Sequence, residues 1–229
     1  MKNKKTLSLG IASAAAMALG ILLSGPVGTL IVGITRPQPN WVDAKTFITN
    51  FDKIQALPFL FGFLTIVGSI IFITSLYRLS DDKKKEMMVP GLIFIGIFGT
   101  IASFNCLIQG IYLPNIVLSA IPGMESIISA LTMTNPSSFP WIAEAFSSAF
   151  FGLALASTAV YFGKSKLDGL IRGLLIANAV VSFFPVIMIL IDSSWFFSFY
   201  GLVCSFFESA IIICIAVMST VSLCESKKS

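Results

Sequence analysis

Six long apolar stretches constrain the fold of this chain more than any other feature. They cover residues 8–34, 56–77, 88–113, 140–163, 169–192 and 197–222. Each is long enough to cross a hydrocarbon core of about 30 Å as a helix. Only 11% of the residues are charged, far below the balance of a soluble domain. Backbone amides in lipid need partners within their own segment, and the alternation of barrel strands is missing. The sequence predicts an all-α integral membrane protein, a single bundle of six transmembrane helices.

The basic residues predict how this bundle is oriented, because Lys and Arg close to a span are retained on the cytoplasmic side. Six crossings place twelve of the fifteen on the side of the termini: Lys2, Lys4, Lys5, Arg78, Lys83, Lys84, Lys85, Lys164, Lys166, Arg172, Lys227 and Lys228. The other three, Arg36, Lys45 and Lys53, fall in the first external loop. We expect both termini in the cytoplasm and the chain in a plasma membrane or a bacterial inner membrane. A bacterial origin is suggested by the Lys-rich, Ile-rich and Phe-rich composition alone.

The segment Pro114–Ser138 is apolar enough to suggest a seventh crossing, but Pro122 and Glu125 interrupt it. A crossing there would leave seven basic residues inside and eight outside, which removes the charge bias. We expect an external cap or a re-entrant segment instead.

The first apolar stretch begins as a secretory signal does, with a basic start and then apolar and small residues. It continues to about Gly33, which exceeds the usual signal core. An uncleaved span is favoured; cleavage would leave five spans with the same orientation downstream.

The first external loop is expected to contain a short amphipathic helix. Asn40 is a plausible N-cap, and Asp43 would lie in the first turn. Trp41, Ala44 and Ile48 have helical spacing. Such a helix either packs on the bundle or covers an external opening.

Several reaction types are excluded by composition. The chain has no histidine, so a Ser–His dyad, a histidine-ligated metal and a histidine-ligated haem are impossible. None of the four cysteines forms a C-x-x-C pair, and no phosphate-binding or dinucleotide-binding glycine motif occurs. No cofactor, metal or nucleic acid partner is expected.

Glu208 is the clearest candidate for a functional residue, because an acid inside a span is costly and usually faces a bundle interior or a wet cavity. It lies roughly 18 Å from the expected outer end of the last span, near the midplane. Ser205 and Ser209 share its face. Since no basic residue is nearby, we expect Glu208 to hold a proton unless a cation binds.

Other late spans carry polar stripes that could join Glu208. Asn105 and Gln109 are one turn apart in the third span, Glu144 lies in the fourth, and Asn178 and Ser182 are one turn apart in the fifth. If these faces converge, they line a recess that opens outward and ends at Glu208. Alternatively, the amides only hold helices together by interhelical hydrogen bonds, and Glu144 lies at the membrane–water interface.

Three functions stay open from the sequence. The first is binding or transport of a small solute, cation or proton through this recess. The second is a non-catalytic membrane subunit, sensor or scaffold, whose polar residues only join helices and whose surface meets a membrane partner or a second copy of the chain. An intramembrane enzyme using Glu208 or Glu144 is the least favoured. A lone acid without a histidine, a cysteine pair or recognisable metal ligands can catalyse few reactions.

Overall fold

The computed structural model of the chain describes residues 2–119, 121–163, 165–192 and 194–228, and for residues 2, 3 and 226–228 the helical backbone alone. Regular secondary structure in these ranges is entirely helical. Six helical segments within them are long and apolar enough to cross a membrane: Lys4–Thr35, Lys53–Leu79, Asp82–Leu118, Phe139–Val160, Lys166–Ile191 and Phe199–Glu225. The predicted all-α fold with six spans is confirmed. Lys164, one of the residues used to predict orientation, lies outside the described ranges.

Several spans consist of more than one helical element. The helices, with 3₁₀ and π turns marked η, are α1 (Lys2–Ser24), α2 (Pro26–Thr35), α3 (Ala44–Asn50), η1 (Lys53–Ala56), α4 (Leu57–Leu79), α5 (Asp82–Leu107), η2 (Ile108–Tyr112), α6 (Leu113–Leu118), α7 (Glu125–Leu131), α8 (Phe139–Ser157), η3 (Thr158–Val160), α9 (Lys166–Ile191), η4 (Trp195–Phe197) and α10 (Phe199–Lys228).

The spans form a closed ring in chain order. α1 packs on α4, α4 on α5, α5 on α8, α8 on α9, α9 on α10, and α10 returns to α1. Glycines permit the closest approach, between α1 and α4. A Cβ on Gly20 would lie 2.4 Å from the backbone nitrogen of Thr65, and one on Gly68 would lie 2.6 Å from that of Met17. These two helices are therefore in backbone contact.

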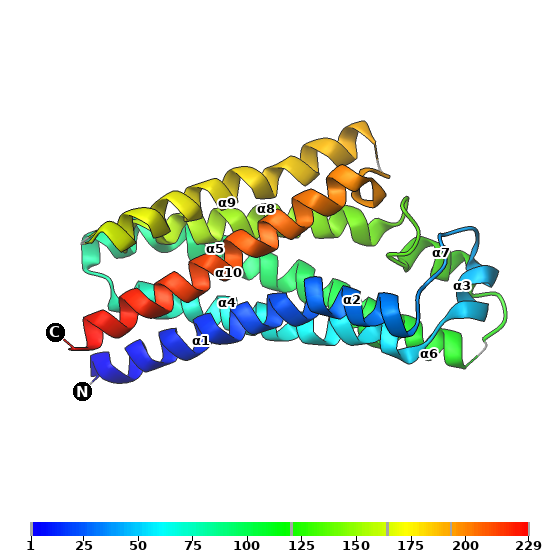
Figure 1. Ribbon diagram of the computed structural model, residues 1–229, viewed down its shortest axis with the longest axis horizontal. Coiled ribbons are helices and arrows are strands. Elements are labelled where there is room, and N and C mark those ends of the chain that lie inside the picture. Colours follow the sequence, from blue (N-terminus) through cyan, green and yellow to red (C-terminus); the bar gives the residue numbers. More distant parts are fainter. Residues whose placement is uncertain (1, 120, 164, 193, 229) are drawn as a thin grey trace.

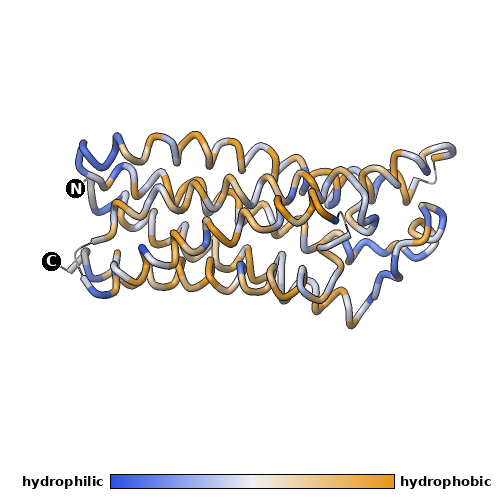
Figure 2. The backbone as a smooth tube through the Cα atoms, turned by 90° about the horizontal axis from the view of Figure 1, so that it is seen from above, coloured by the Kyte–Doolittle hydropathy of each residue, from blue (hydrophilic) through white to orange (hydrophobic). Residues whose placement is uncertain are grey.

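Both termini lie at one end of the bundle, and α3 and α7 lie at the other (Figure 1). Hydrophilic residues gather at the two ends, and the middle of the bundle is predominantly apolar (Figure 2). At the end with the termini, short turns join α4 to α5 and α8 to α9. Side-chain caps begin the second helix of each pair: Asp81 accepts a hydrogen bond from the Lys84 amide at 3.0 Å, and Ser165 accepts one from the Asp168 amide at 3.1 Å.

The expected helix in the first loop exists as α3, but its start was predicted wrongly. Asp43, not Asn40, is the N-cap, and its carboxylate accepts a hydrogen bond of 2.7 Å from the Thr46 amide. Asn40 lies three residues too early to reach the first free amides of the helix. α3 packs on α7, with Phe47 buried between them and the ends of the spans opposite the termini.

The segment 114–138 does not cross the bundle. Its first residues extend the third span as α6, and the rest turns back through α7 to the start of α8. Together with α3 it forms a small apolar cluster at the end opposite the termini.

Candidate functional site

A cavity of about 880 Å³ lies in the half of the bundle opposite the termini. Its walls come from all six spans, the loop between α2 and α3, and the segment between α7 and α8. Ile21 is among its deepest lining residues, about 20 Å along the first span from the end of α2 at 1.5 Å per residue. The cavity therefore reaches well into the membrane-spanning part.

Two carboxylic acids line this cavity, Glu144 from α8 and Glu208 from α10. Among the described residues, no Lys, Arg or Asp lines it with them. Cys106 is the other titratable lining residue, and Cys204 lies one turn from Glu208 on α10. Both acids therefore share a space without a basic partner in the described chain.

Glu208 is joined to α9 by a short chain of hydrogen bonds. The Ser182 hydroxyl donates to Oε1 of Glu208 at 2.5 Å, and the Asn178 amide nitrogen donates to the same hydroxyl oxygen at 3.4 Å. Ser182 and Asn178 are fully buried and are not lining residues, so they stand behind Glu208. α10 begins at Phe199, which places Glu208 about 14 Å from the helix end, somewhat shallower than predicted.

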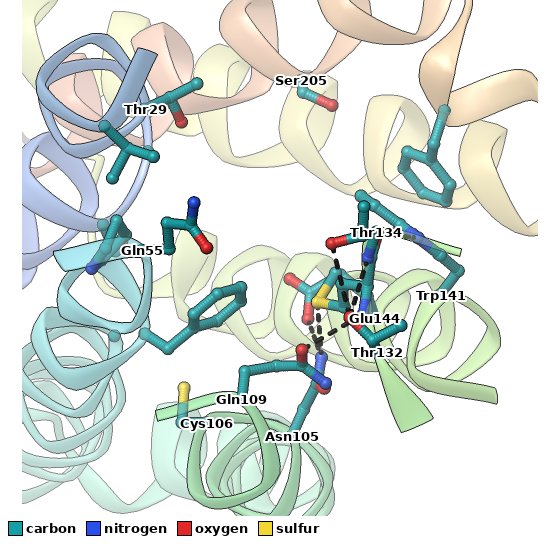
Figure 3. A pocket seen from close by; sticks show the side chains of 18 of the residues that line it. Thr29, Gln55, Asn105, Cys106, Gln109, Thr132, Thr134, Trp141, Glu144 and Ser205 are labelled. Atoms are coloured by element: carbon teal, nitrogen blue, oxygen red, sulfur yellow. Dashed lines mark hydrogen bonds between the residues drawn. The ribbon is translucent and has the colours of Figure 1, made fainter. Parts of the chain in front are cut away.

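Glu144 has a comparable partner on the neighbouring helix. The Asn105 amide nitrogen donates to Oε2 of Glu144 at 2.9 Å, and both residues line the cavity (Figure 3). The π turn η2 begins just after Asn105, where it widens the helix. In the described part of the chain, one oxygen of Glu144 and one of Glu208 therefore keep no hydrogen-bond partner.

Gln109 holds the backbone of the segment that follows α7. Its amide nitrogen donates to the Leu131 carbonyl at 2.6 Å, and its carbonyl oxygen accepts from the Met133 amide at 3.1 Å. Trp141 adds a bond from its indole nitrogen to the Met133 carbonyl at 2.8 Å. These contacts fix residues 131–133 as part of the cavity wall.

Six of the eight predicted site residues line the cavity: Asn105, Gln109, Glu144, Ser205, Glu208 and Ser209. Ser205 donates to the Gly201 carbonyl of its own helix at 3.0 Å. Ser209 lies where α10 meets the junction of α1 and α2, since a Cβ on Gly25 would come within 3.6 Å of its hydroxyl. The remaining two, Asn178 and Ser182, do not line the cavity. They are linked to it by the hydrogen bonds from Asn178 to Ser182 and from Ser182 to Glu208. The binding roles of all eight stay predictions.

The aromatic character of the walls was not predicted from the sequence. Trp141 stacks on Phe196 with ring centroids 4.7 Å apart, and Phe98 stacks on Phe151 at 4.5 Å. Aromatic lining residues come from several elements distant in the sequence: Trp41, Phe47, Phe51, Phe59, Phe98, Trp141, Phe151, Phe196 and Phe197. Periodicity within one helix cannot show which of many aromatic faces meet, although Trp41 and Trp141 at span ends were a partial signal.

Toward the termini the bundle is tightly packed with apolar side chains. Ile171 and Leu175 of α9 and Ile215 and Leu223 of α10 have no exposed surface. Farther along the same seam, the Ser222 hydroxyl donates to Asp168 Oδ1 at 2.7 Å. An apolar layer therefore lies between Glu208 and the polar groups at the termini.

The fold and its site define a multi-pass helical membrane protein with an acidic, aromatic-lined cavity in one half of the bundle. No protein-family model matches the sequence, and neither a curated protein nor a solved structure matches the chain.

Proposed function

We propose that this chain binds a small solute or cation in the cavity and exchanges it for a proton at Glu208. The observation that carries this proposal is the pair Glu144 and Glu208, which line one cavity without a lining Lys or Arg in the described chain. A carboxylate in a low-dielectric wall needs a positive partner, which is a proton or a bound cation.

The hydrogen-bond donors on the walls support this role. Ser182 and Asn105 donate to the two acids, which favours the charged carboxylate that a cation requires. Ser205 and Ser209 line the same cavity, so hydroxyl oxygens belong to its walls together with the two acids. Neutral oxygens and carboxylates together suit a positively charged ligand.

The charge distribution supports an orientation with the cavity facing away from the cytoplasm. Lys4, Lys5, Arg78, Lys83–Lys85 and Lys166 belong to the end of the bundle that holds the termini. Under the positive-inside rule that end is cytoplasmic. The cavity then lies in the outer half of the membrane, and the apolar layer near the termini must open for transport.

A structural role is favoured for Gln109 among the predicted site residues that line the cavity. Both ends of its amide group are engaged by the backbone of residues 131–133. The scaffold alternative thus accounts for this residue, but it leaves the two acids unexplained.

Reconstitution into proteoliposomes tests the proposal. A membrane-impermeant pH-sensitive dye is present outside the vesicles, where Na⁺, K⁺ or tetraethylammonium is added in turn. We expect at least one cation to release protons from the wild-type protein and Glu208→Gln to abolish the release. Glu125→Gln, which changes an acid of α7 that does not line the cavity, serves as the control and should behave as wild type. Identical proton release from the wild type and Glu208→Gln would refute the proposal.

A further inference from the structure

We infer that the ligand is an organic cation with apolar substituents, such as a quaternary ammonium or phosphonium ion, and that it enters the cavity sideways from the membrane. This inference rests on the proposed function and names the chemical class of its ligand. It depends on the charge of the cavity, its aromatic walls and the gap between α2 and α10.

The number and placement of the acids favour a large cation over a compact one. Glu144 and Glu208 belong to α8 and α10, which are not neighbours in the ring. No cluster of three or more His, Cys, Asp or Glu side chains able to hold a metal ion occurs in the described part of the chain. A small hard cation takes six or more close oxygen ligands, whereas an organic cation spreads its charge over a larger surface.

The walls supply the contacts that such a surface needs. Nine of the lining residues are Phe or Trp, including the stacked pairs Trp141–Phe196 and Phe98–Phe151. Aromatic faces attract cations that have shed their water, each by about 0.5–2 kcal/mol. A volume of about 880 Å³ accommodates a ligand of drug-like size.

The ring of helices is closed near Gly25 and Ser209 and separates beyond them. α10 packs along α1 but makes at most sparse contact with α2, and Figure 1 shows the two helices diverging toward the end opposite the termini. At the same level of the first span, Gly25 and Pro26 interrupt the helix between α1 and α2.

The gap between α2 and α10 is lined by small polar residues and flanked by exposed apolar ones. Thr29 of α2 and Ser205 of α10 are both exposed and both line the cavity, and they face the same space in Figure 3. The outer flanks carry Leu30 and Ile34 on α2 and Leu202 and Phe206 on α10, all exposed. At the depth of a membrane span these flanks contact acyl chains, so the gap connects the cavity with the lipid.

A lipid-soluble cation can use this route directly from the bilayer, without first passing through water at the external loops. Its apolar substituents meet the aromatic walls, and its charge meets Glu208 and Glu144. The titratable groups that line the cavity with Glu208 are Glu144 on α8 and Cys106 on α5, while α9 presents Ser182 to it. Competition between protons and the organic cation therefore takes place mainly at the two carboxyls.

Binding measurements with tetraphenylphosphonium test the ligand class. The protein is purified into lipid nanodiscs, and binding is followed by quenching of tryptophan fluorescence and by calorimetry, with neutral triphenylphosphine oxide as the uncharged comparison. We expect saturable binding of the phosphonium, weakened at least tenfold by Glu208→Gln, and much weaker binding of the neutral compound. Glu125→Gln should leave both unchanged.

The outcomes separate this inference from the proposed function. Release of protons by Na⁺ or K⁺ that depends on Glu208, without binding of tetraphenylphosphonium, overturns the organic cation and leaves the proposed function standing. If no cation shows binding or proton release that depends on Glu208, both the organic-cation inference and the proposed function are overturned. Equal binding of the neutral and charged compounds also overturns the inference.

A kinetic measurement tests the lateral route. Ser205→Trp places a bulky ring in the gap, and it should slow association of membrane-partitioned tetraphenylphosphonium at least fivefold while changing the equilibrium affinity less. Val217→Trp, at an exposed position on the same helix outside the cavity lining, is the matched control. Association rates that are the same in both variants overturn entry between α2 and α10.

Discussion

Ser182 on α9 and Glu208 on α10 are joined by a hydrogen bond of 2.5 Å between two spans, and it is the one direct polar contact of Glu208 with another helix in the described chain. The Ser182 side chain is completely buried, whereas Glu208 borders the cavity. The hydroxyl thus stabilises the carboxylate from behind and leaves its other side to a ligand.

Replacing Ser182 with Ala should weaken cation binding about tenfold at fixed pH. A hydrogen bond to a charged group contributes about 1.5–3 kcal/mol, and 1.4 kcal/mol corresponds to a factor of ten. Calorimetric titration with tetraphenylphosphonium or the most active inorganic cation measures the change. Ser69→Ala is the control, because that fully buried hydroxyl bonds to its own helix at the Thr65 carbonyl and does not line the cavity. Equal losses in the two variants would show that Ser182 has no special role.

Gln109→Leu should loosen the segment after α7 without unfolding the bundle. The substitution leaves the Leu131 carbonyl and the Met133 amide without their partner, at a cost of about 1–3 kcal/mol for each buried group. Hydrogen exchange at Met133 should accelerate by at least tenfold. Asn105→Leu removes an amide that bonds only to side chains, so exchange at Met133 should not change. Protection at Met133 that survives Gln109→Leu contradicts this assignment.

The sequence predicted the number of spans and their approximate bounds, because length and apolarity are local properties of each segment. It also identified the polar stripes, since residues one helical turn apart share a face. It could not decide which faces meet. Asn178 and Ser182 have the same spacing as Asn105 and Gln109, yet the first pair stands behind Glu208 and the second pair lines the cavity. That difference depends on the rotation of each helix in the ring, which packing with other helices determines.

Gly20→Ala should destabilise the contact between α1 and α4. The added Cβ would lie 2.4 Å from the Thr65 backbone nitrogen, which no side-chain rotation relieves. Overpacking of this kind costs about 1–3 kcal/mol. Thermal unfolding in detergent measures the loss. Gly96→Ala is the matched control in α5, where a Cβ meets no heavy atom within 4 Å. A Gly20→Ala protein as stable as Gly96→Ala would contradict the backbone contact.

The docking of α3 should weaken in acid. The hydrogen bond from the Thr46 amide to the Asp43 carboxylate holds the pKa of Asp43 below its ordinary value. Because the folded-state pKa is depressed, the stabilisation is present above about pH 4 and is lost as the pH falls through the lower, folded-state value. Fluorescence of Trp41, whose ring lies 6.4 Å from that of Phe47, reports the change in a Trp141→Phe, Trp195→Phe background.

Asp43→Asn is the control for this pH dependence, since Asn caps helices equally well but does not titrate in this range. The acid transition of Trp41 should disappear in that variant. If the transition persists unchanged in Asp43→Asn, it is caused by the titration of another group.

Opening the apolar layer near the termini should convert the protein into a proton leak. Leu175 of α9 and Ile215 of α10 are fully buried in this layer, and neither lines the cavity, whose lining on the described parts of these two helices ends at Pro185 and Ile212. Leu175→Ser removes about 2–5 kcal/mol of packing and lets water enter the seam between the two helices. A proton bound at Glu208 then reaches the side of the termini, and proteoliposomes with an imposed pH gradient should lose it several times faster. Leu190→Ser, at a position of α9 with 80% exposure, should leave the gradient intact. Combining Leu175→Ser with Glu208→Gln should restore the slow decay, because the leak passes through that carboxyl; a leak that persists in the double variant would mean that water crosses the bundle without using Glu208.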